Sequence, residues 1–206
     1  MNGNARRASA GPLLWAVVFV MVLAWSAWRP HDVTIWILEA APALVAAAVL
    51  WATRRRFPLT PLAYGLILVH AIILMVGAHY TYAEVPAGDW VRDAFGQSRN
   101  NYDKLGHLAQ GFVPAIIARE VVIRLRVFSS AAWRNFFIVC FCVAVAAVYE
   151  LLEWWVALLS GETAEAFLSM QGYQWDTQAD MWTALIGVVA ALALLGRVHD
   201  RQLAAL

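Results

Sequence analysis

The sequence is short of charged residues and of cysteine, and each shortage excludes a class of protein. Only 14% of the 206 residues are Asp, Glu, Lys or Arg, whereas an ordinary soluble domain carries about 25%. The net charge of +1 provides no broad basic field for nucleic acid. Two cysteines cannot form the disulfide framework of a small secreted domain. The chain is therefore not an ordinary soluble domain, a disulfide-rich domain or a nucleic-acid binder.

The two cysteines, Cys140 and Cys142, lie in one apolar run. Side chains two positions apart on a helix point about 200° away from each other, so these two cannot pair. We interpret both as small core residues.

Hydrophobic residues make up 62% of the chain, with a mean hydropathy of +0.62. One membrane span needs about 20 apolar residues, so the composition allows about six. The runs are long, rich in Ala, Leu and Val, and without the alternation of strands. They predict an all-α polytopic membrane helix bundle in one domain, 11–196, between a tail over 1–10 and a tail over 197–206. The predicted spans cover 11–28, 33–52, 60–82, 104–125, 135–159 and 179–196.

The first run resembles a signal peptide, but Trp25 and Trp28 stand where small cleavage-site residues are expected, so we interpret it as an uncleaved span. The basic residues then predict that both termini are cytoplasmic, because that orientation places eleven of the fifteen inside. The four left on the outer side are Arg29, Arg92, Arg99 and Lys104. Two outer loops of about 20 residues, 83–103 and 160–178, are long enough to be functional or disordered.

The acidic residues are distributed in the opposite way. Only Glu120 and Asp200 fall on the predicted cytoplasmic side. The remaining twelve lie outside or in the outer half of a span, namely Asp32, Glu39, Glu84, Asp89, Asp93, Asp103, Glu150, Glu153, Glu162, Glu165, Asp176 and Asp180.

Three of the predicted helices carry pairs of ionisable residues near the same membrane level. The pairs are Asp103 with His107, Glu150 with Glu153, and Asp176 with Asp180. Members of a pair lie three or four positions apart and share a helix face. Small residues follow on the same faces, including Gly111, Ala146 and Gly187, as is typical of packed membrane helices. The pairs are therefore predicted to point into the bundle.

Five carboxylates and one imidazole in a small, partly dry volume repel one another unless cations or protons are present. The sequence thus predicts a candidate divalent-metal site made of Asp103, His107, Glu150, Glu153, Asp176 and Asp180. Oxygen ligands with one nitrogen suit Mg²⁺, Mn²⁺, Ca²⁺, Fe²⁺ or Zn²⁺. Alternatively, Lys104, Arg92 or Arg99 could fold in and neutralise the carboxylates. Glu150 and His107 are the candidate catalytic residues.

Some of these residues also have a simpler interpretation. Asp103 and Asp176 could cap the N-termini of their helices, and Asp180 could serve the dipole of the last helix. Glu39 lies in the outer part of the second predicted span, at a depth where it could contact the residues of the cluster. His70 and His79 lie on opposite faces of one helix, so they cannot both face one site.

At the opposite end of the fourth span, Arg119, Glu120 and Arg124 fit an ion-paired helix end whose arginines extend toward water.

Several motifs together resemble the YjdF-type bacterial inner-membrane family over about residues 15–195. They are Tyr102-Asp103-Lys104-Leu105-Gly106-His107 with Gln110-Gly111-Phe112, Tyr149-Glu150-Leu151-Leu152-Glu153-Trp154, Gln171-Gly172, and Trp175-Asp176-Thr177-Gln178-Ala179-Asp180-Met181. The chain departs from the family pattern at Gly172-Tyr173, where a Gly-Asp pair is usual. The resemblance implies a multi-span inner-membrane protein and no particular activity. A fainter similarity to VanZ-like membrane proteins, on the Asp-Lys-x-x-His element, implies a shared scaffold only.

Three functions remain open at this point. The cluster could be the metal centre of an enzyme acting on a lipid- or envelope-derived substrate at the outer leaflet. It could relay protons or bind a cation during transport. It could also fix helix packing in a binding or structural membrane module. The acids stop in the outer half of the spans, which favours a site open to one side. The sequence does not indicate an oligomeric state.

Overall fold

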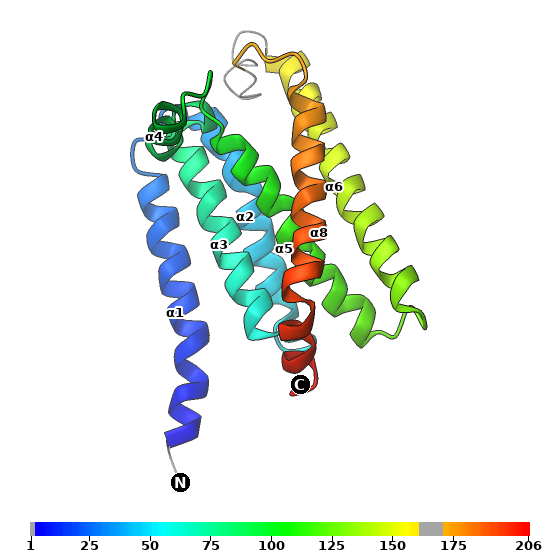
Figure 1. Ribbon diagram of the computed structural model, residues 1–206. Coiled ribbons are helices and arrows are strands. Elements are labelled where there is room, and N and C mark those ends of the chain that lie inside the picture. Colours follow the sequence, from blue (N-terminus) through cyan, green and yellow to red (C-terminus); the bar gives the residue numbers. More distant parts are fainter. Residues whose placement is uncertain (1–2, 161–170) are drawn as a thin grey trace.

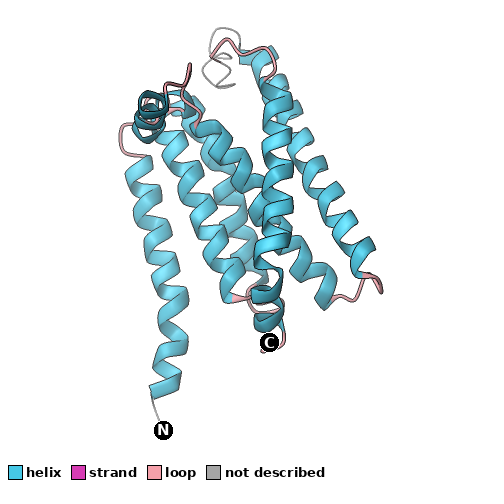
Figure 2. Ribbon diagram, viewed as in Figure 1, coloured by secondary structure: helices cyan, strands magenta, loops and turns pink. Residues whose placement is uncertain are grey.

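The computed structural model describes residues 3–160 and 171–206, with side chains from 11 to 159 and from 171 onward. This part of the chain is helical, and short loops join the helices (Figure 2). The helices are α1 (Gly3–Ser26), α2 (Val33–Thr53), α3 (Pro61–Tyr80), the 3-10 turn η1 (Tyr82–Glu84), α4 (Pro86–Phe95), α5 (Tyr102–Arg124), α6 (Ala131–Ser160) and α8 (Asp176–Leu203). The all-α prediction is confirmed.

Local sequence signals set several helix ends. The Asp32 carboxylate accepts a hydrogen bond from the Ile35 amide and caps α2. Thr60 caps α3 in the same way, and Pro61 follows at the first helical position, where its missing N–H costs nothing. Gly96 ends α4 in the left-handed conformation that glycine adopts without strain.

Helix α5 lies at the centre of the bundle and packs against α3, α6 and α8, while α1 and α2 pack against α3 (Figure 1). Two glycines allow α5 and α8 to approach closely. A Cβ atom on Gly111 would overlap the Ala184 carbonyl, and one on Gly187 would overlap the Leu108 carbonyl. The predicted packing face of small residues is thus the α5–α8 interface.

Four helices, α2, α3, α6 and α8, are long and apolar enough to cross a membrane. Helix α1 has a shorter apolar part, Gly11–Ser26. Helix α5 does not qualify among the described residues, because charged side chains occupy both of its ends. A helical membrane bundle is therefore present, and the count of six spans remains a prediction.

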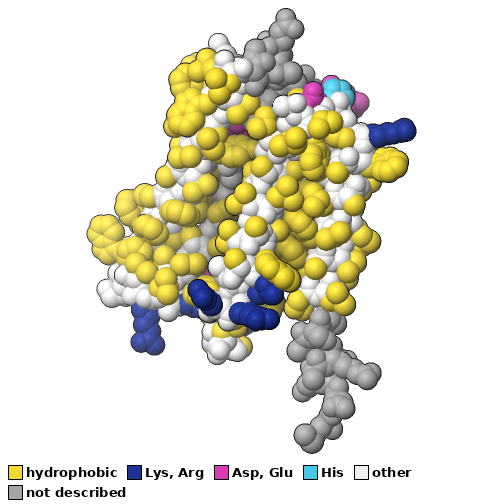
Figure 3. Space-filling view, turned by 180° about the vertical axis from the view of Figure 1, so that it is seen from behind, with side chains coloured by type: hydrophobic (Ala, Val, Ile, Leu, Met, Phe, Trp, Pro, Cys, Tyr) yellow, Lys and Arg dark blue, Asp and Glu magenta, His cyan; other side chains and the backbone are white. Residues whose placement is uncertain are grey.

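Charge divides the molecule along its length. Apolar side chains cover most of the visible face, and most of the visible Lys and Arg side chains lie at one end (Figure 3). We call this the basic end; it contains Arg119, Arg134 and Arg197. Asp103 and Asp180 lie at the opposite, acidic end. The first residues of α1 and the last residues of α8 lie at the basic end (Figure 1).

Three expectations about chain segments need correction or refinement. The predicted loop 83–103 contains the helix α4, and α8 continues to Leu203 through most of the predicted tail 197–206. α1 includes most of the predicted tail 1–10. Residues 161–170 of the predicted loop 160–178, with Glu162 and Glu165, lie outside the described residues.

The interpretation of both cysteines as core residues is right for Cys142, which is buried, and wrong for Cys140. Cys140 lies on the exposed face of α6 together with Phe136, Phe137 and Phe141, because α6 packs only one side of its surface against α5 and α8.

Candidate functional site

The acidic end holds a cluster of carboxylates around one buried imidazole. His107 is 4% exposed. Its Nε2 atom lies 3.4 Å from Asp103 Oδ1, 3.7 Å from Glu150 Oε1 and 3.7 Å from Asp180 Oδ1. Glu153 completes a second group with His107 and Glu150 in which one ligand atom per residue lies within 4.8 Å of the others. Five of the six predicted metal ligands are thus adjacent.

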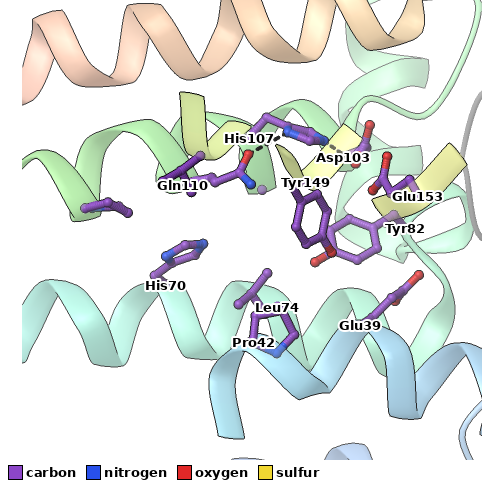
Figure 4. Close-up of a pocket in the computed structure, with 13 residues that line it drawn as sticks. Glu39, Pro42, His70, Leu74, Tyr82, Asp103, His107, Gln110, Tyr149 and Glu153 are labelled. Atoms are coloured by element: carbon purple, nitrogen blue, oxygen red, sulfur yellow. Dashed lines mark hydrogen bonds and ion pairs between the residues drawn. The ribbon is translucent and has the colours of Figure 1, made fainter. Parts of the chain in front are cut away.

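The other ring nitrogen of His107 has a different partner. Nδ1 lies 2.9 Å from Gln110 Oε1, one helical turn further along α5 (Figure 4). Because the amide oxygen only accepts, this contact places a proton on Nδ1. In a neutral imidazole the Nε2 lone pair then faces the three carboxylates. This is the orientation a metal-binding histidine requires.

Helix geometry explains why these groups meet. Asp103 and His107 are separated by one turn of α5, and Glu150 and Glu153 by three positions on α6. Asp180 reaches them because the glycine contacts bring α8 against α5. The structure thus brings together both members of the first two pairs and Asp180 of the third.

Asp176 is held differently from the other five residues. Its Oδ1 atom accepts hydrogen bonds from Arg99 Nη2 at 2.5 Å and from Lys104 Nζ at 2.7 Å. Lys104, the only lysine in the chain, also donates to Asp180 Oδ1 at 2.5 Å. Asp176 belongs to neither of the two candidate ligand groups. Its carboxylate is a structural ion-pair partner in this arrangement.

Of the three cations considered as partners of the carboxylates, Lys104 and Arg99 form ion pairs with residues of the cluster. Arg92 instead pairs with Asp89 and Asp93 on the surface of α4.

The capping interpretation does not fit Asp103 or Asp176. The residues at the caps are Asn101 for α5 and Trp175 for α8, and neither makes a side-chain capping bond.

Negative charge exceeds positive charge around His107. With Glu39, six carboxylates lie here, against the cations Lys104, Arg99 and a protonated His107. Three oxygen atoms of these carboxylates have no hydrogen-bond donor among the described residues. They are both oxygens of Glu39, which is 2% exposed, and Oε1 of Glu150. Burying such groups unpaired is costly, so the cluster is suited to a bound cation or to protons.

A cavity of about 200 Å³ opens beside the cluster and is lined by residues of α2, α3, η1, α5 and α6 (Figure 4). Its polar lining includes Glu39, His70, Asp103, His107 and Glu153. Glu39 thus reaches the site, as its depth predicted, and Nε2 of His70 has no hydrogen-bond partner among the described residues. The rest of the wall is mostly apolar: Pro42, Leu74, Pro114 and Val145.

His79 does not face the cavity; its Nδ1 atom lies 3.0 Å from the Ser26 carbonyl oxygen. The two histidines of α3 therefore point to different surroundings, as predicted.

Two aromatic residues of the cavity were not identified from the sequence. Tyr82 fits between α3 and α5 where glycines leave room: a Cβ on Gly77 would come within 2.6 Å of its ring, and one on Gly106 within 3.1 Å. The Tyr82 side chain is buried. Tyr149 contacts His107 edge to face, with ring centroids 6.2 Å apart. The sequence signal for this position of Tyr82 was Gly106, which lies in the Tyr-Asp-Lys-Leu-Gly-His motif and leaves room for the ring.

A second buried polar network lies at the basic end. The expectation that Arg119 extends toward water is wrong, because Arg119 is 5% exposed and Glu120 is fully buried. Glu120 accepts hydrogen bonds from the amide and hydroxyl of Thr60 and from Arg124. Its Oε2 atom also lies 3.1 Å from Nε2 of the fully buried His199. His199 was missed because it falls in the segment taken as a tail.

Comparisons with known proteins match almost the whole chain. The family model described as predicted membrane protein (DUF2238) matches residues 11–201. The chain belongs to this family. It is also 47% identical over 188 residues to the Escherichia coli protein named inner membrane protein YjdF. The aligned residues make up 91% of this chain and 90% of that protein. The resemblance drawn from the sequence motifs is confirmed. No solved structure matches the chain.

The chain is therefore an integral membrane protein with several helices able to cross a membrane, and its relative is a protein of the bacterial inner membrane. The cluster around His107 and the network around Glu120 both lie within the residues that the DUF2238 model covers.

Proposed function

We propose that the protein crosses the inner membrane six times, with both termini in the cytoplasm and the acidic end outside. The position of the start of α1 and the end of α8 at the same end of the bundle supports an even number of crossings. The concentration of arginines at the basic end supports its cytoplasmic location. In this arrangement α5 is the fourth span, and its charged ends are covered by α3, α6 and α8 instead of lipid.

We propose further that the cluster around His107 binds a divalent cation. The observation that carries this proposal is the position of three carboxylate oxygens 3.4–3.7 Å from His107 Nε2. Ligands bound about 2.1 Å from one tetrahedral ion are separated by about 3.4 Å, so these atoms need little movement to share an ion. The bond from Nδ1 to Gln110 supports the same role, because it orients the ring.

The cavity supports hydrolytic or transfer chemistry on a lipid- or envelope-derived substrate. Its apolar wall suits the hydrocarbon part of such a molecule, and its acidic edge lies beside the proposed ion. A divalent ion held by ligands from among Asp103, His107, Glu150 and Asp180 would supply Lewis-acid polarisation of a carbonyl or phosphoryl oxygen. Glu150 or His107, whichever is not coordinating, takes the proton from the attacking water.

The apolar core between the two ends supports a site reached from one side. Ala115, Ile116, Ile138 and Val188 are completely buried and belong to one core cluster. Ala115 and Ile116 lie in α5 between Gln110, which lines the cavity, and Arg119, which belongs to the basic-end network. No described polar side chain of α5 therefore bridges the cavity and this network. This favours catalysis or sensing over conduction.

Metal analysis tests the site. We expect protein purified without chelator, or reloaded with Mn²⁺ or Zn²⁺ after chelation, to hold a stoichiometric amount of metal by elemental analysis. H107A and E150Q should lose it while keeping the wild-type elution profile. D93N is the matched control, because Asp93 lies at the same end with a side chain 69% exposed. If wild type, H107A and D93N bind the same amount of each ion, the metal proposal is wrong.

Flux measurements in proteoliposomes test the one-sided site independently. We expect no Mn²⁺ or proton flux above that of empty vesicles. Flux that E150Q abolishes would replace the catalytic proposal with transport.

A further inference from the structure

A second cavity lies at the basic end, where its α8 lining runs from Leu192 to Asp200, well beyond Asp180 of the acidic cluster. It measures about 250 Å³ and lies between the first turn of α6 and the last turns of α8, with Arg119 of α5 at its base. Three arginines line it, Arg119, Arg134 and Arg197, against one acid, Asp200. The proposed metal function uses none of these residues.

The charges of this cavity are only partly balanced within the protein. Arg119 donates to Asp200 Oδ1 at 2.6 Å, so these two neutralise each other. Arg134 and Arg197 have no side-chain hydrogen bond or ion pair with any described residue. The Nε atom of Arg134 is buried without an acceptor. An unsatisfied buried donor on a charged group is costly, so the cavity is built to receive an acceptor from outside the chain.

The chemistry of the lining points to a phosphate group. Guanidinium groups bind phosphate with two parallel hydrogen bonds, and two of them here have no competing carboxylate. Arg134 lies in the first turn of α6, a helix of 30 residues, where the helix dipole also favours an anion. Gly196 leaves the wall open, since no atom lies within 4 Å of where its Cβ would be.

The side chains around the cavity indicate which kind of molecule contains the phosphate group. Large apolar side chains flank it on both helices: Trp133 and Phe136 on α6 are 65% and 61% exposed, and Leu194 on α8 is 70% exposed. This surface suits acyl chains. Basic pockets between membrane helices at the cytoplasmic level are typical sites for anionic lipid headgroups.

We propose that the cavity between α6 and α8 at the basic end binds a phosphate group, carried by an anionic phospholipid of the inner leaflet. Arg134 and Arg197 hold the phosphate oxygens, and the acyl chains lie along Trp133 and Leu194. Arg119 stays paired with Asp200 and forms the base of the site.

Native mass spectrometry of the full chain in neutral detergent tests this site. The probes are cardiolipin, phosphatidylglycerol, zwitterionic phosphatidylcholine, and inorganic phosphate and pyrophosphate as competitors. We expect wild type to retain the two anionic lipids and not phosphatidylcholine. The R134Q/R197Q variant should bind them at least about tenfold more weakly, given about a fivefold contribution from each basic residue. Folding should survive, because neither side chain is paired.

The matched control is R55Q/R56Q, which removes two exposed arginines from the loop at the same end and leaves the cavity intact. It should bind like wild type. G196L removes no charge but fills the cavity, and it should weaken binding as R134Q/R197Q does. Displacement of the lipids by millimolar phosphate or pyrophosphate would show that the phosphate group alone is recognised. Retention against them would show that the acyl chains contribute. Equal binding by R134Q/R197Q and R55Q/R56Q, or no preference for anionic lipid in wild type, would overturn the proposal.

Discussion

Replacing Lys104 with methionine should destabilise the acidic end more than any other single loss of charge there. Its ammonium group bonds to Asp176 at 2.7 Å and to Asp180 at 2.5 Å, and its side chain is only 19% exposed. Removing one partner of a buried ion pair costs about 3–5 kcal/mol. The residual exposure of Lys104 reduces this to about 2–3 kcal/mol by partial solvent screening. Methionine retains the length and apolar contacts of the side chain, so the loss of stability measures the effect of removing the positive charge.

The measurement is thermal unfolding in detergent followed by tryptophan fluorescence. A loss of about 2–3 kcal/mol corresponds to a fall in Tm of about 4–12 °C for a chain of this size. The matched control is R92M, because Arg92 lies at the same end and pairs with carboxylates that are more exposed. We expect its Tm to stay close to that of wild type.

The double variant K104M/D180N separates electrostatics from packing. It removes one carboxylate together with the ammonium group, so it should recover part of the stability lost in K104M, with a coupling of about 1–3 kcal/mol. If K104M unfolds at the temperature of R92M, or if D180N gives no recovery, then the excess negative charge is not compensated by Lys104 and the reasoning fails.

Three further substitutions test packing and hydrogen bonding. G187A should lower the free energy of unfolding by about 1–3 kcal/mol in denaturant titration, because its methyl group would overlap the Leu108 carbonyl, whereas G65A, in open space, should be neutral. T60V should cost about 1.5–3 kcal/mol in the same titration, because it removes a hydrogen bond to the buried Glu120 carboxylate; equal loss in T53V, whose hydroxyl is exposed, would contradict this. N100A should expose the α4 segment to limited proteolysis at native temperature, because Asn100 bonds to the Val85 carbonyl and the Tyr102 amide; unchanged cleavage would show that these bonds do not hold the segment.

Much of the bundle was predictable because membrane helices follow simple rules. Long apolar runs require helices in lipid, and the predicted starts at residues 33 and 60 agree with the first residues of α2 and α3, Val33 and Pro61, to within about one residue. The ends at water were less predictable. Leu203 ends α8 well beyond the apolar run, because His199 is buried against Glu120 and the helix continues to place it there.

The acidic cluster was predictable from helical periodicity, but the pairing within it was not. Spacing placed Asp103, His107 and Asp180 on inward faces at one depth. It could not assign Asp176 to Arg99 and Lys104, because that choice depends on side-chain distances across helices. For the same reason the sequence did not identify Tyr82, whose place depends on two glycines in different helices.

The charged ends of α5 have a consequence for how the protein is made. Asp103, Lys104, Arg119 and Glu120 disfavour release of α5 alone into lipid, since each such charge costs up to about 2.5–3.5 kcal/mol on insertion scales. Their partners on α8 are synthesised more than 50 residues later. In the proposed topology we therefore expect the nascent α5 to enter the bilayer together with α8 instead of alone. A chain ending before α8 would leave α5 without its counter-charges and expose it to quality-control proteolysis.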